Sequence, residues 1–295
     1  SKIFIIYVSL TFILFGLYFV NGMSIFDAIT HSFTTISTGG FSTHNNSFAF
    51  FDNQSILIIA IIFMILGSLP FLVIAQTSFK NLFATFKDHQ VRIFLIILLL
   101  SIFIIYFFAQ KYLEGNSFSK IITISFNTIS IISGTGYVST NFENWGNYAS
   151  VLFLILMFIG GCAGSTTGGL KVFRFQILFK YISLHLKRML KPHAVIATHF
   201  NGKKVNESTY ESVMSFFFIY IFTFAMSALL LSFSGMDFLT CFSAAASAIS
   251  NVGPGLGSVI GPEGNYSSLT DYSKIILVFT MFLGRLEMLT ILILF

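Results

Sequence analysis

Long apolar runs that contain no charged side chain constrain the fold of this chain more than any other feature. They occupy residues 3–22, 54–79, 93–110, 148–170, 212–236 and 275–284. Most reach the roughly 20 residues that a helix needs to cross the hydrocarbon core of a bilayer. Only 9% of the 295 residues are charged, too few to cover the surface of a soluble domain of this length. The sequence therefore predicts an all-α, polytopic membrane protein.

The positive charges are concentrated in two connecting segments. Residues 77–93 and 170–205 are rich in Lys and Arg, whereas the remaining loops are mainly acidic. Because Lys and Arg favour the cytoplasmic side, both segments are expected in the cytoplasm. The net charge of +5 is therefore a sign of membrane topology. We expect no nucleic-acid partner, because no nucleic-acid-binding motif accompanies the basic residues.

A five-residue pattern, Ile-Ser-x-x-Gly, occurs three times, beginning at Ile36, Ile132 and Ile249. Each copy follows a segment that is too short to cross a bilayer and too apolar for water: residues 24–36, 118–132 and 237–249. An apolar run precedes each short segment, and another follows each pattern. The repeating unit is therefore a spanning helix, a short helix, a glycine-containing strand and a second spanning helix. Asp27 and Asp237 suit the first turn of their short helices.

The units are expected at residues 1–82, 83–178 and 207–295. Between the last two, residues 179–206 are expected to finish an amphipathic helix and to form a hairpin. Basic and apolar residues alternate at helical spacing over 175–192, as in a helix that lies on a membrane surface, and Asn201-Gly202 predicts the hairpin turn. Pro70 is expected to kink the inner helix of the first unit, because proline removes a backbone hydrogen bond.

A short helix that enters the membrane and returns as extended chain is a re-entrant loop. Irregular backbone at membrane depth is tolerated only where it lines water or is buried in protein. Glycine allows conformations that turn successive carbonyl oxygens toward one axis, where they replace the hydration shell of a cation. The C-terminal end of each short helix carries partial negative charge, which favours a cation at the same point. The repeats therefore predict a cation pore lined by main-chain oxygens.

A glycine-rich stretch interrupts the apolar run at 148–170: Gly160-Gly161-Cys162-Ala163-Gly164-Ser165-Thr166-Thr167-Gly168-Gly169. Each glycine disfavours a helix by up to about 1 kcal/mol relative to alanine, so a loop is expected within the membrane. A nucleotide-binding P-loop is excluded, because no Gly-Lys-Ser/Thr follows. A serine protease centred on Ser165 is disfavoured, because no histidine lies in an expected spanning helix to act as base.

These stretches resemble the Trk/Ktr/HKT superfamily of potassium transporters, and most closely its TrkH-type pore-forming subunits. The resemblance is carried by residues 37–43, 134–137, 160–171, 251–257 and 284–287, and it extends over essentially the whole chain. It implies channel-like K⁺ uptake through a pore of approximate fourfold symmetry, with no enzymatic chemistry. The implied ion-binding filter comprises Ser37, Thr38, Gly39, Gly40 and Phe41, then Ser133, Gly134, Thr135, Gly136 and Tyr137, then Ser250, Asn251, Val252, Gly253 and Pro254.

The resemblance also implies that the stretch from Gly160 to Gly169 lies across the pore below the filter as a gate. Arg285 interrupts the last apolar run, so it must face a cavity or a partner; its candidates are Glu287, the oxygens of the loop, or water in the ion path. The resemblance implies contact between Arg285 and the gate loop, either as a barrier to cations or as a structural tether.

Further expectations concern ions, partners and location. The family has four units, so we expect one more upstream of this chain. K⁺ is the expected transported ion, and Na⁺ a second permeant ion, because Ser42 and Pro254 depart from the Gly-Tyr-Gly pattern of potassium channels. The resemblance implies a homodimer in the cell membrane, with the filters facing outside and a cytoplasmic, nucleotide-binding TrkA-type regulator. No covalently bound cofactor is expected.

Two other functions compete with a pore. A Na⁺- or H⁺-coupled secondary transporter also uses broken helices near the midplane, but it would need inverted repeats and intramembrane carboxylates. A non-conducting scaffold would have no need for glycines in three re-entrant strands. The six histidines have no metal-ligand spacing, although His31 and His44 near the outer mouth are candidates for tuning conduction with pH. Cys162 and Cys241 are expected to be buried, unpaired thiols.

Overall fold

The computed structural model describes residues 2–76, 85–191 and 199–286. Nearly all regular structure in these ranges is helical, which confirms the predicted all-α class. The principal elements, in chain order, are α1 (Lys2–Val20), α2 (Ile25–Ile36), α3 (Gln54–Ser68), α4 (Phe71–Gln76), α5 (His89–Ala109), α6 (Ser117–Ile132), α7 (Asn147–Phe158), α8 (Val172–Leu190), β1 (His199–Phe200), β2 (Lys203–Lys204), α9 (Glu207–Ser232), α10 (Phe238–Ser250) and α11 (Asp271–Arg285), with short 3₁₀ turns η1 (Ser47–Phe50), η3 (Phe142–Trp145) and η4 (Tyr266–Ser268).

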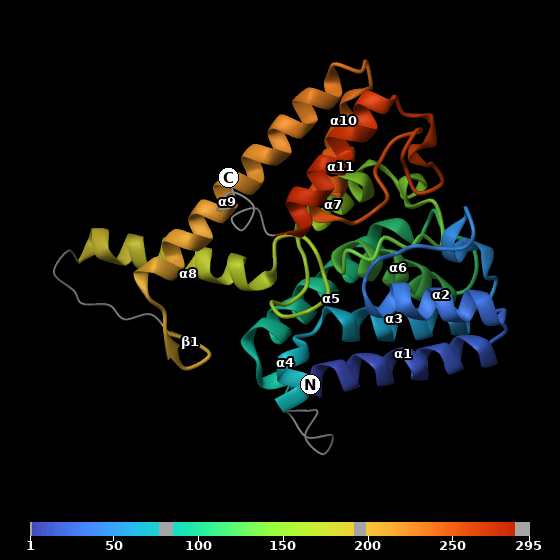
Figure 1. Cartoon of the computed structure of the whole chain (residues 1–295), viewed down its shortest axis with the longest axis horizontal. Helices are drawn as coiled ribbons and strands as arrows, with labels where there is room; N and C mark the ends of the chain where they lie inside the picture. Colours follow the sequence, from blue (N-terminus) through green and yellow to red (C-terminus); the bar gives the residue numbers. More distant parts are fainter. Residues whose placement is uncertain (1, 77–84, 192–198, 287–295) are drawn as a thin grey trace.

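Three units follow one another along the chain, as the repeats predict. Each has a long first helix, a short second helix and an inner helix: α1, α2 and α3 in the first unit, α5, α6 and α7 in the second, α9, α10 and α11 in the third. Figure 1 shows them in blue, green and orange to red, grouped around central loops. The inner helix of one unit packs on the short helix of the next, α3 on α6 and α7 on α10. Successive units are therefore packed against each other in the same way.

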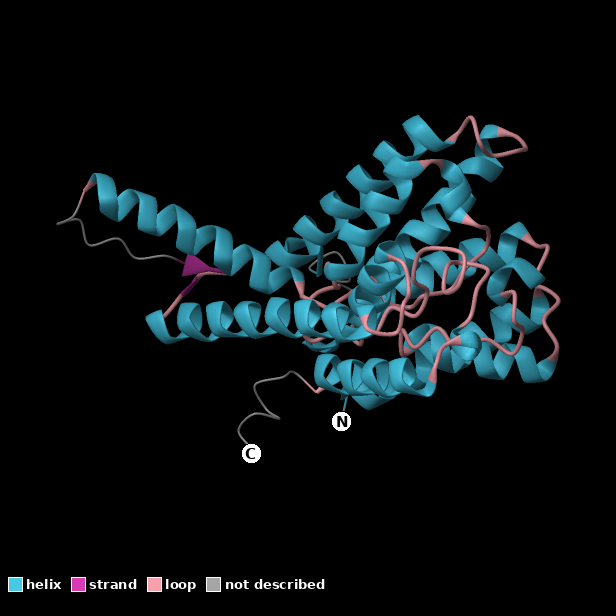
Figure 2. Cartoon of the chain, turned by 90° about the horizontal axis from the view of Figure 1, so that it is seen from above, coloured by secondary structure: helices cyan, strands magenta, loops and turns pink. Residues whose placement is uncertain are grey.

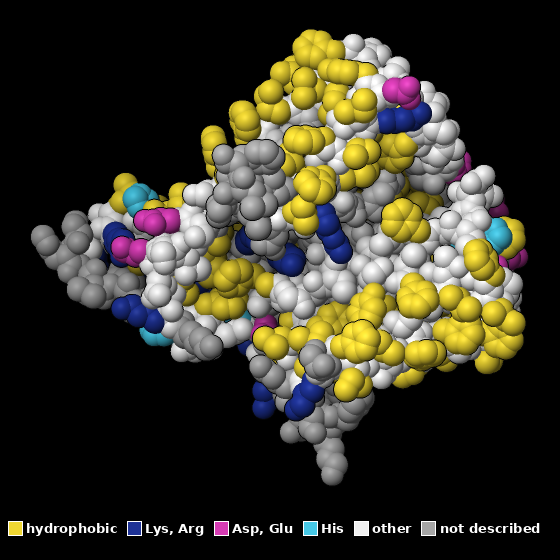
Figure 3. Space-filling view, in the orientation of Figure 1, with side chains coloured by type: hydrophobic (Ala, Val, Ile, Leu, Met, Phe, Trp, Pro, Cys, Tyr) yellow, Lys and Arg dark blue, Asp and Glu magenta, His cyan; other side chains and the backbone are white. Residues whose placement is uncertain are grey.

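The long first helices have the length and composition of membrane spans. Within the described ranges, these are α1, α5 and α9, with mean hydropathies of 2.5, 2.8 and 2.1 over their most apolar windows. Large apolar side chains remain exposed on all three, including Phe12, Phe103 and Phe218. Figure 3 shows such side chains spread over much of the surface. Exposed apolar faces of this extent suit a protein surrounded by lipid.

The inner helices of the first two units are interrupted near the positions that the sequence predicts. We expected a kink at Pro70 in the run 54–79 and a glycine-rich break at Gly160 in the run 148–170, and the helices that precede these points are α3, of 15 residues, and α7, of 12. α3 ends at Ser68 because Pro70 supplies no backbone N–H, and α4 begins after it. α7 ends at Phe158, just before the first two glycines of the predicted loop. Both breaks lie at the helix ends that lead into the predicted cytoplasmic segments, residues 77–93 and 170–205.

The three short helices begin with equivalent caps. Ser24, Asn116 and Asp237 each accept a hydrogen bond from the backbone N–H three residues on. Asp27 lies in the first turn of α2 as predicted. The prediction for Asp237 was wrong by one position, because Asp237 is the N-cap of α10, where its carboxylate accepts bonds from the backbone and hydroxyl of Thr240. These bonds hold the pKa of Asp237 below its usual value.

Replacing Asp237 with alanine is expected to destabilise the protein by about 1 kcal/mol, because the backbone N–H of Thr240, in the first turn of α10, loses its acceptor. The loss should appear as a lower unfolding temperature of the purified full-length protein at neutral pH. Asp271→Ala is the matched control, since Asp271 lies in the first turn of α11 but Thr270 caps that helix. An equal shift for both variants would contradict the capping role of Asp237.

The segment after the second unit contains a surface helix and a hairpin. α8 covers most of the predicted amphipathic segment and carries exposed apolar side chains together with Lys180, Lys187 and Arg188. β1 and β2 pair antiparallel around Asn201-Gly202, which confirms the turn, whereas the flanking residues 194–198 lie outside the described residues. Figure 2 shows α8 extending away from the main helical body.

Candidate functional site

The three Ile-Ser-x-x-Gly stretches have the same backbone conformation. The third residue of each copy has a positive φ, as does the fifth: Thr38 (51°), Gly134 (66°) and Asn251 (55°) at the third position, and Gly40 (68°), Gly136 (80°) and Gly253 (113°) at the fifth. Carbonyl oxygens of a regular strand alternate in direction. Residues with a positive φ at every second position change that alternation, and glycine adopts this conformation readily. The repeat in sequence is therefore also a repeat in backbone geometry.

The amide groups of these strands turn back onto the ends of the short helices. The N–H of Gly39 donates to the oxygen of Thr34 at 2.8 Å, and the N–H groups of Thr135 and Val252 donate to residues five positions earlier at 3.0 Å. Within the described residues, no hydrogen bond reaches the main-chain oxygens of Thr38–Gly40, Gly134–Gly136, Asn251 or Val252. The oxygen of Gly253 differs, because it accepts from the hydroxyl of Tyr266 at 2.7 Å.

Neighbouring strands touch through equivalent positions. A side-chain carbon added to Gly40 would lie 1.6 Å from the main-chain oxygen of Thr135. One added to Gly136 would lie 1.7 Å from the oxygen of Val252. In both contacts the fifth residue of one copy meets the fourth residue of the next. Only glycine allows this approach, so the two contacts place the three strands in succession around a shared centre.

An open cavity of about 640 Å³ occupies this centre. Filter candidates from all three units line it, with Arg285 and residues of the outer loops: Ser37, Thr38, Gly39, Gly40, Phe41, Thr135, Gly136, Asn251, Val252, Gly253 and Pro254. Ser133, Gly134, Tyr137 and Ser250 do not line it. A side-chain carbon on Gly134 would lie 3.6 Å from the nitrogen of Gly168, which places that strand's start against the predicted gate loop.

The sixth residues of the three copies have different surroundings. Phe41 is 75% exposed beside the cavity, whereas Tyr137 is fully buried. The hydroxyl of Tyr137 lies 2.5 Å from that of Thr34 and 3.1 Å from that of Thr35. Its main-chain oxygen accepts a bond from the hydroxyl of Ser130 at 2.7 Å. Tyr137 therefore anchors the second strand to α2 rather than facing the cavity.

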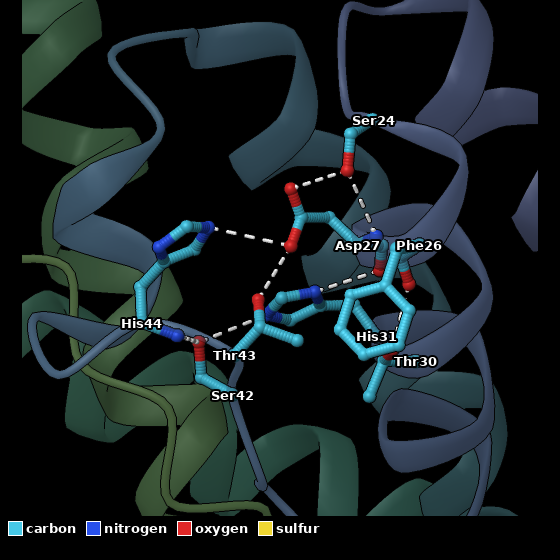
Figure 4. Close-up of polar contacts among 8 residues, drawn as sticks. All are labelled: Ser24, Phe26, Asp27, Thr30, His31, Ser42, Thr43 and His44. Atoms are coloured by element: carbon cyan, nitrogen blue, oxygen red, sulfur yellow. Dashed lines mark hydrogen bonds and ion pairs between the residues drawn. The ribbon is translucent and has the colours of Figure 1, made fainter.

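The loop after the first strand is tied to the start of α2 by polar contacts (Figure 4). The carboxylate of Asp27 accepts from the hydroxyl of Thr43 at 2.5 Å and lies 3.3 Å from Nε2 of His44. Buried His31 lies 2.9 Å from the hydroxyl of Ser42 through its own Nε2. His44 lines the cavity and His31 does not, so His44 is the better placed for the predicted effect of pH on conduction.

The predicted gate loop lies against the first unit. The hydroxyl of Thr166 is 3.1 Å from the main-chain oxygens of both Ile36 and Gly67, and it accepts a bond from the hydroxyl of Thr38 at 3.2 Å. The N–H of Cys162 donates to the oxygen of Ser68 at 3.0 Å. These contacts join the loop to the end of α2, to the first strand and to the end of α3.

The same loop reaches the other two units. A side-chain carbon on Gly168 would lie 2.4 Å from the oxygen of Ser250, at the end of α10. The N–H of Ala163 donates to the side chain of Gln90 on α5 at 3.0 Å. The two ends of the loop meet, since the N–H of Gly160 donates to the oxygen of Leu170 at 2.9 Å. The loop is therefore in contact with all three units.

Arg285 contacts this loop, as the resemblance implies. Its guanidinium donates to the oxygen of Thr166 at 3.2 Å. Arg285 lines the central cavity and also a smaller one of about 150 Å³ formed by residues 165–169, the start of α8, α9 and α11. It therefore stands at the boundary between two cavities that the loop separates. Glu287, its other candidate partner, lies outside the described residues.

Sequence reasoning missed several residues that support the site. Glu143 accepts a bond from the N–H of Gly257 at 2.5 Å, joining the outer loops of the second and third units. Tyr266 holds the third strand through its hydroxyl group. Tyr137 was predicted as a filter residue, but no pattern in the sequence marked the contacts of its hydroxyl with α2. Among the described residues, no group of His, Cys, Asp and Glu could hold a metal ion. Cys162 and Cys241 are buried and free, as predicted.

Three repeats of a long helix, a short helix, a left-handed strand and an inner helix around one cavity define a polytopic membrane protein of re-entrant-loop architecture. The model of the TrkH family, described as "Cation transport protein", matches residues 2–295. The chain belongs to this family.

Individual relatives agree with this assignment. The chain is 37% identical over 291 residues to the Trk system potassium uptake protein TrkI of Halomonas elongata, covering 98% of this chain and 59% of the relative. It is 36% identical over 299 residues to the Trk system potassium uptake protein TrkH of Escherichia coli K12, covering 100% and 61%. The crystal structure of the potassium transporter TrkH from Vibrio parahaemolyticus superposes with a TM-score of 0.89 at 34% identity, covering 99% and 62%. The chain thus spans about three fifths of the length of these relatives.

Proposed function

We propose that the protein mediates K⁺ uptake across the cell membrane through a channel-like pore. The observation that carries the proposal is the convergence of three left-handed strands on one cavity, with main-chain oxygens that accept no hydrogen bond within the described residues. Such oxygens replace the hydration shell of a monovalent cation without a titratable side chain. The relatives that carry the name potassium uptake protein support K⁺ as the ion.

The filter proposed here comprises the oxygens of residues 38–40, 134–136 and 251–252. The oxygen of Gly253 already accepts a bond from Tyr266, so that strand offers one fewer free ligand. Fewer equivalent oxygens favour weaker discrimination between K⁺ and Na⁺. Na⁺ is therefore proposed as a second permeant ion, carried more slowly than K⁺.

The loop from Gly160 to Gly169 is proposed as the gate of this pore. Its contacts with all three units and its position between two cavities support that role. Arg285 is proposed to contribute in two ways. Its hydrogen bond holds Thr166 in place, and its positive charge beside both cavities raises the energy of a cation there.

The orientation follows from the charge distribution. The basic segments at 77–93 and 170–205 are proposed to face the cytoplasm and the three strands to face outside. α8 and the hairpin then lie on the cytoplasmic surface, where a nucleotide-binding TrkA-type regulator is the proposed partner. A homodimer is the proposed assembly. Both assignments rest on family resemblance.

Ion flux into liposomes that contain the full-length protein tests this function. We expect K⁺ influx driven by the K⁺ gradient or by membrane potential alone, and slower Na⁺ influx under the same potential. If uptake required a Na⁺ or H⁺ gradient, the protein would be a coupled secondary transporter and the proposal of a channel-like pore would be wrong. Absence of any flux from correctly inserted protein would favour a scaffold.

A further inference from the structure

The third filter strand departs from the other two at its fifth residue, Gly253. In the first two copies, the N–H of the fifth residue donates to a main-chain oxygen of the short helix, that of Thr34 or Ser130. The N–H of Gly253 donates instead to a side chain, the hydroxyl of Ser247, at 3.0 Å. Its φ of 113° is also larger than the 68° and 80° of its counterparts. The peptide of Gly253 is therefore oriented differently from those of the other two copies.

The outer end of the third strand also lacks a bond that secures the other two. Each short helix carries a hydroxyl residue two positions before the Ile-Ser-x-x-Gly pattern: Thr34, Ser130 and Ser247. In the first two units this hydroxyl lies 2.9 Å and 2.7 Å from the main-chain oxygen of the sixth residue, Phe41 or Tyr137. In the third unit, no hydrogen bond from the described residues reaches the oxygen of the sixth residue, Pro254.

A tyrosine from the outer loop contacts the third strand at this point. The hydroxyl of Tyr266, which lies 13 residues further along the chain at the start of η4, donates to the oxygen of Gly253 at 2.7 Å. Asn265 caps η4 by accepting from the N–H of Ser267 at 3.0 Å, and the ammonium of Lys274 on α11 donates to the oxygen of Ser267 at 3.0 Å. The turn that carries the tyrosine is therefore fixed to the inner helix of its own unit.

The hydroxyl of Tyr266 competes with a cation for the oxygen of Gly253. Both residues line the central cavity. The corresponding oxygens of Gly40 and Gly136 accept no hydrogen bond within the described part of the chain. The proton that Tyr266 donates carries partial positive charge and lies against a lone pair that an ion would otherwise use. The number of coordinating oxygens is one of the properties that distinguish K⁺ from Na⁺.

We propose that Tyr266 is a specificity-determining residue, whose hydroxyl withholds the oxygen of Gly253 from the ion and thereby lowers the preference of the pore for K⁺ over Na⁺. This assignment rests on the proposed function, because it requires that the three strands bind the permeating ion. A purely structural role predicts the opposite effect. If the bond only held the strand in place, its loss would loosen the filter and reduce discrimination between the two ions.

Tyr266→Phe tests the assignment, because it removes the hydroxyl and keeps the ring. The measurement is the ratio of initial K⁺ and Na⁺ influx into liposomes that contain the full-length protein, at one membrane potential. We expect the ratio to rise about fivefold with K⁺ influx retained, the factor to which one hydrogen bond of typical net strength corresponds. Tyr272→Phe is the matched control, since Tyr272 is exposed at the start of α11 and its hydroxyl has no described partner, so the ratio should not change.

The outcomes separate this assignment from the pore itself. An unchanged or lower ratio in Tyr266→Phe, or loss of K⁺ influx in that variant alone, overturns the role of Tyr266 and leaves the proposed pore in place. Absence of flux already in the unmodified protein overturns the pore and this assignment together.

Diffraction gives a second measurement that does not depend on transport. Crystals of the Tyr266→Phe variant grown in Rb⁺ should show an anomalous peak within coordination distance of the oxygen of Gly253 that crystals of the unmodified protein lack. Identical peaks in both crystals would contradict the assignment.

Discussion

Gly136→Ala is expected to reduce K⁺ uptake to the background of empty liposomes while leaving membrane insertion intact. The added methyl carbon would lie 1.7 Å from the oxygen of Val252, and Gly136 has a φ of 80° that a side chain disfavours. Relief requires the second and third strands to separate at the point where their oxygens are proposed to bind the ion. The measurement is ion flux at fixed membrane potential, with the amount of inserted protein quantified.

Gly235→Ala is the matched control for backbone strain. Gly235 has a φ of 76°, close to that of Gly136, but a side-chain carbon there would meet nothing within 4 Å. The control should therefore share the conformational cost without the clash and should retain uptake. If both variants conduct alike, close packing of the strands is irrelevant to transport, and the proposed filter is wrong.

Deletion of residues 162–168 is expected to raise K⁺ flux severalfold in the absence of any regulator. The deletion is feasible because the loop ends already meet, with the N–H of Gly160 bonded to the oxygen of Leu170. Removing the loop takes away the contacts of Thr166 with the first unit and the partner of Arg285. The separation between the two cavities should disappear with it.

Point variants in the loop separate gating from general damage. Thr166→Val keeps the shape of the side chain but removes the hydroxyl that joins the loop to Ile36, Gly67 and Thr38, so flux should rise to an intermediate level. Ser165→Ala removes a hydroxyl that bonds only within the loop and should have little effect. Unchanged flux in the deletion variant would remove the gate assignment.

The repeat made much of the fold predictable from sequence. Three copies of Ile-Ser-x-x-Gly, each behind a short amphipathic segment, are a local signal. They predicted α2, α6 and α10 to within a residue or two of their observed ends. The break after α7 was equally local, because glycines at 160 and 161 disfavour a helix wherever they lie.

Other features depend on contacts between distant residues. Thr38 and Asn251 adopt positive φ although neither is glycine, because the turn from helix to strand imposes the conformation in every copy. Tyr137 occupies the same position in its unit as exposed Phe41 but is buried against α2. Hydropathy alone gives too long an inner helix for the first unit, since the run of apolar residues continues through Pro70 although α3 does not.

The most direct test of the central claim is anomalous diffraction from crystals of the full-length protein grown in Tl⁺ or Rb⁺. The account predicts electron-dense peaks on a line through the central cavity, within coordination distance of the main-chain oxygens of residues 38–40, 134–136 and 251–252. Peaks confined to carboxylates or to the outer loops, with none among these strands, would contradict it.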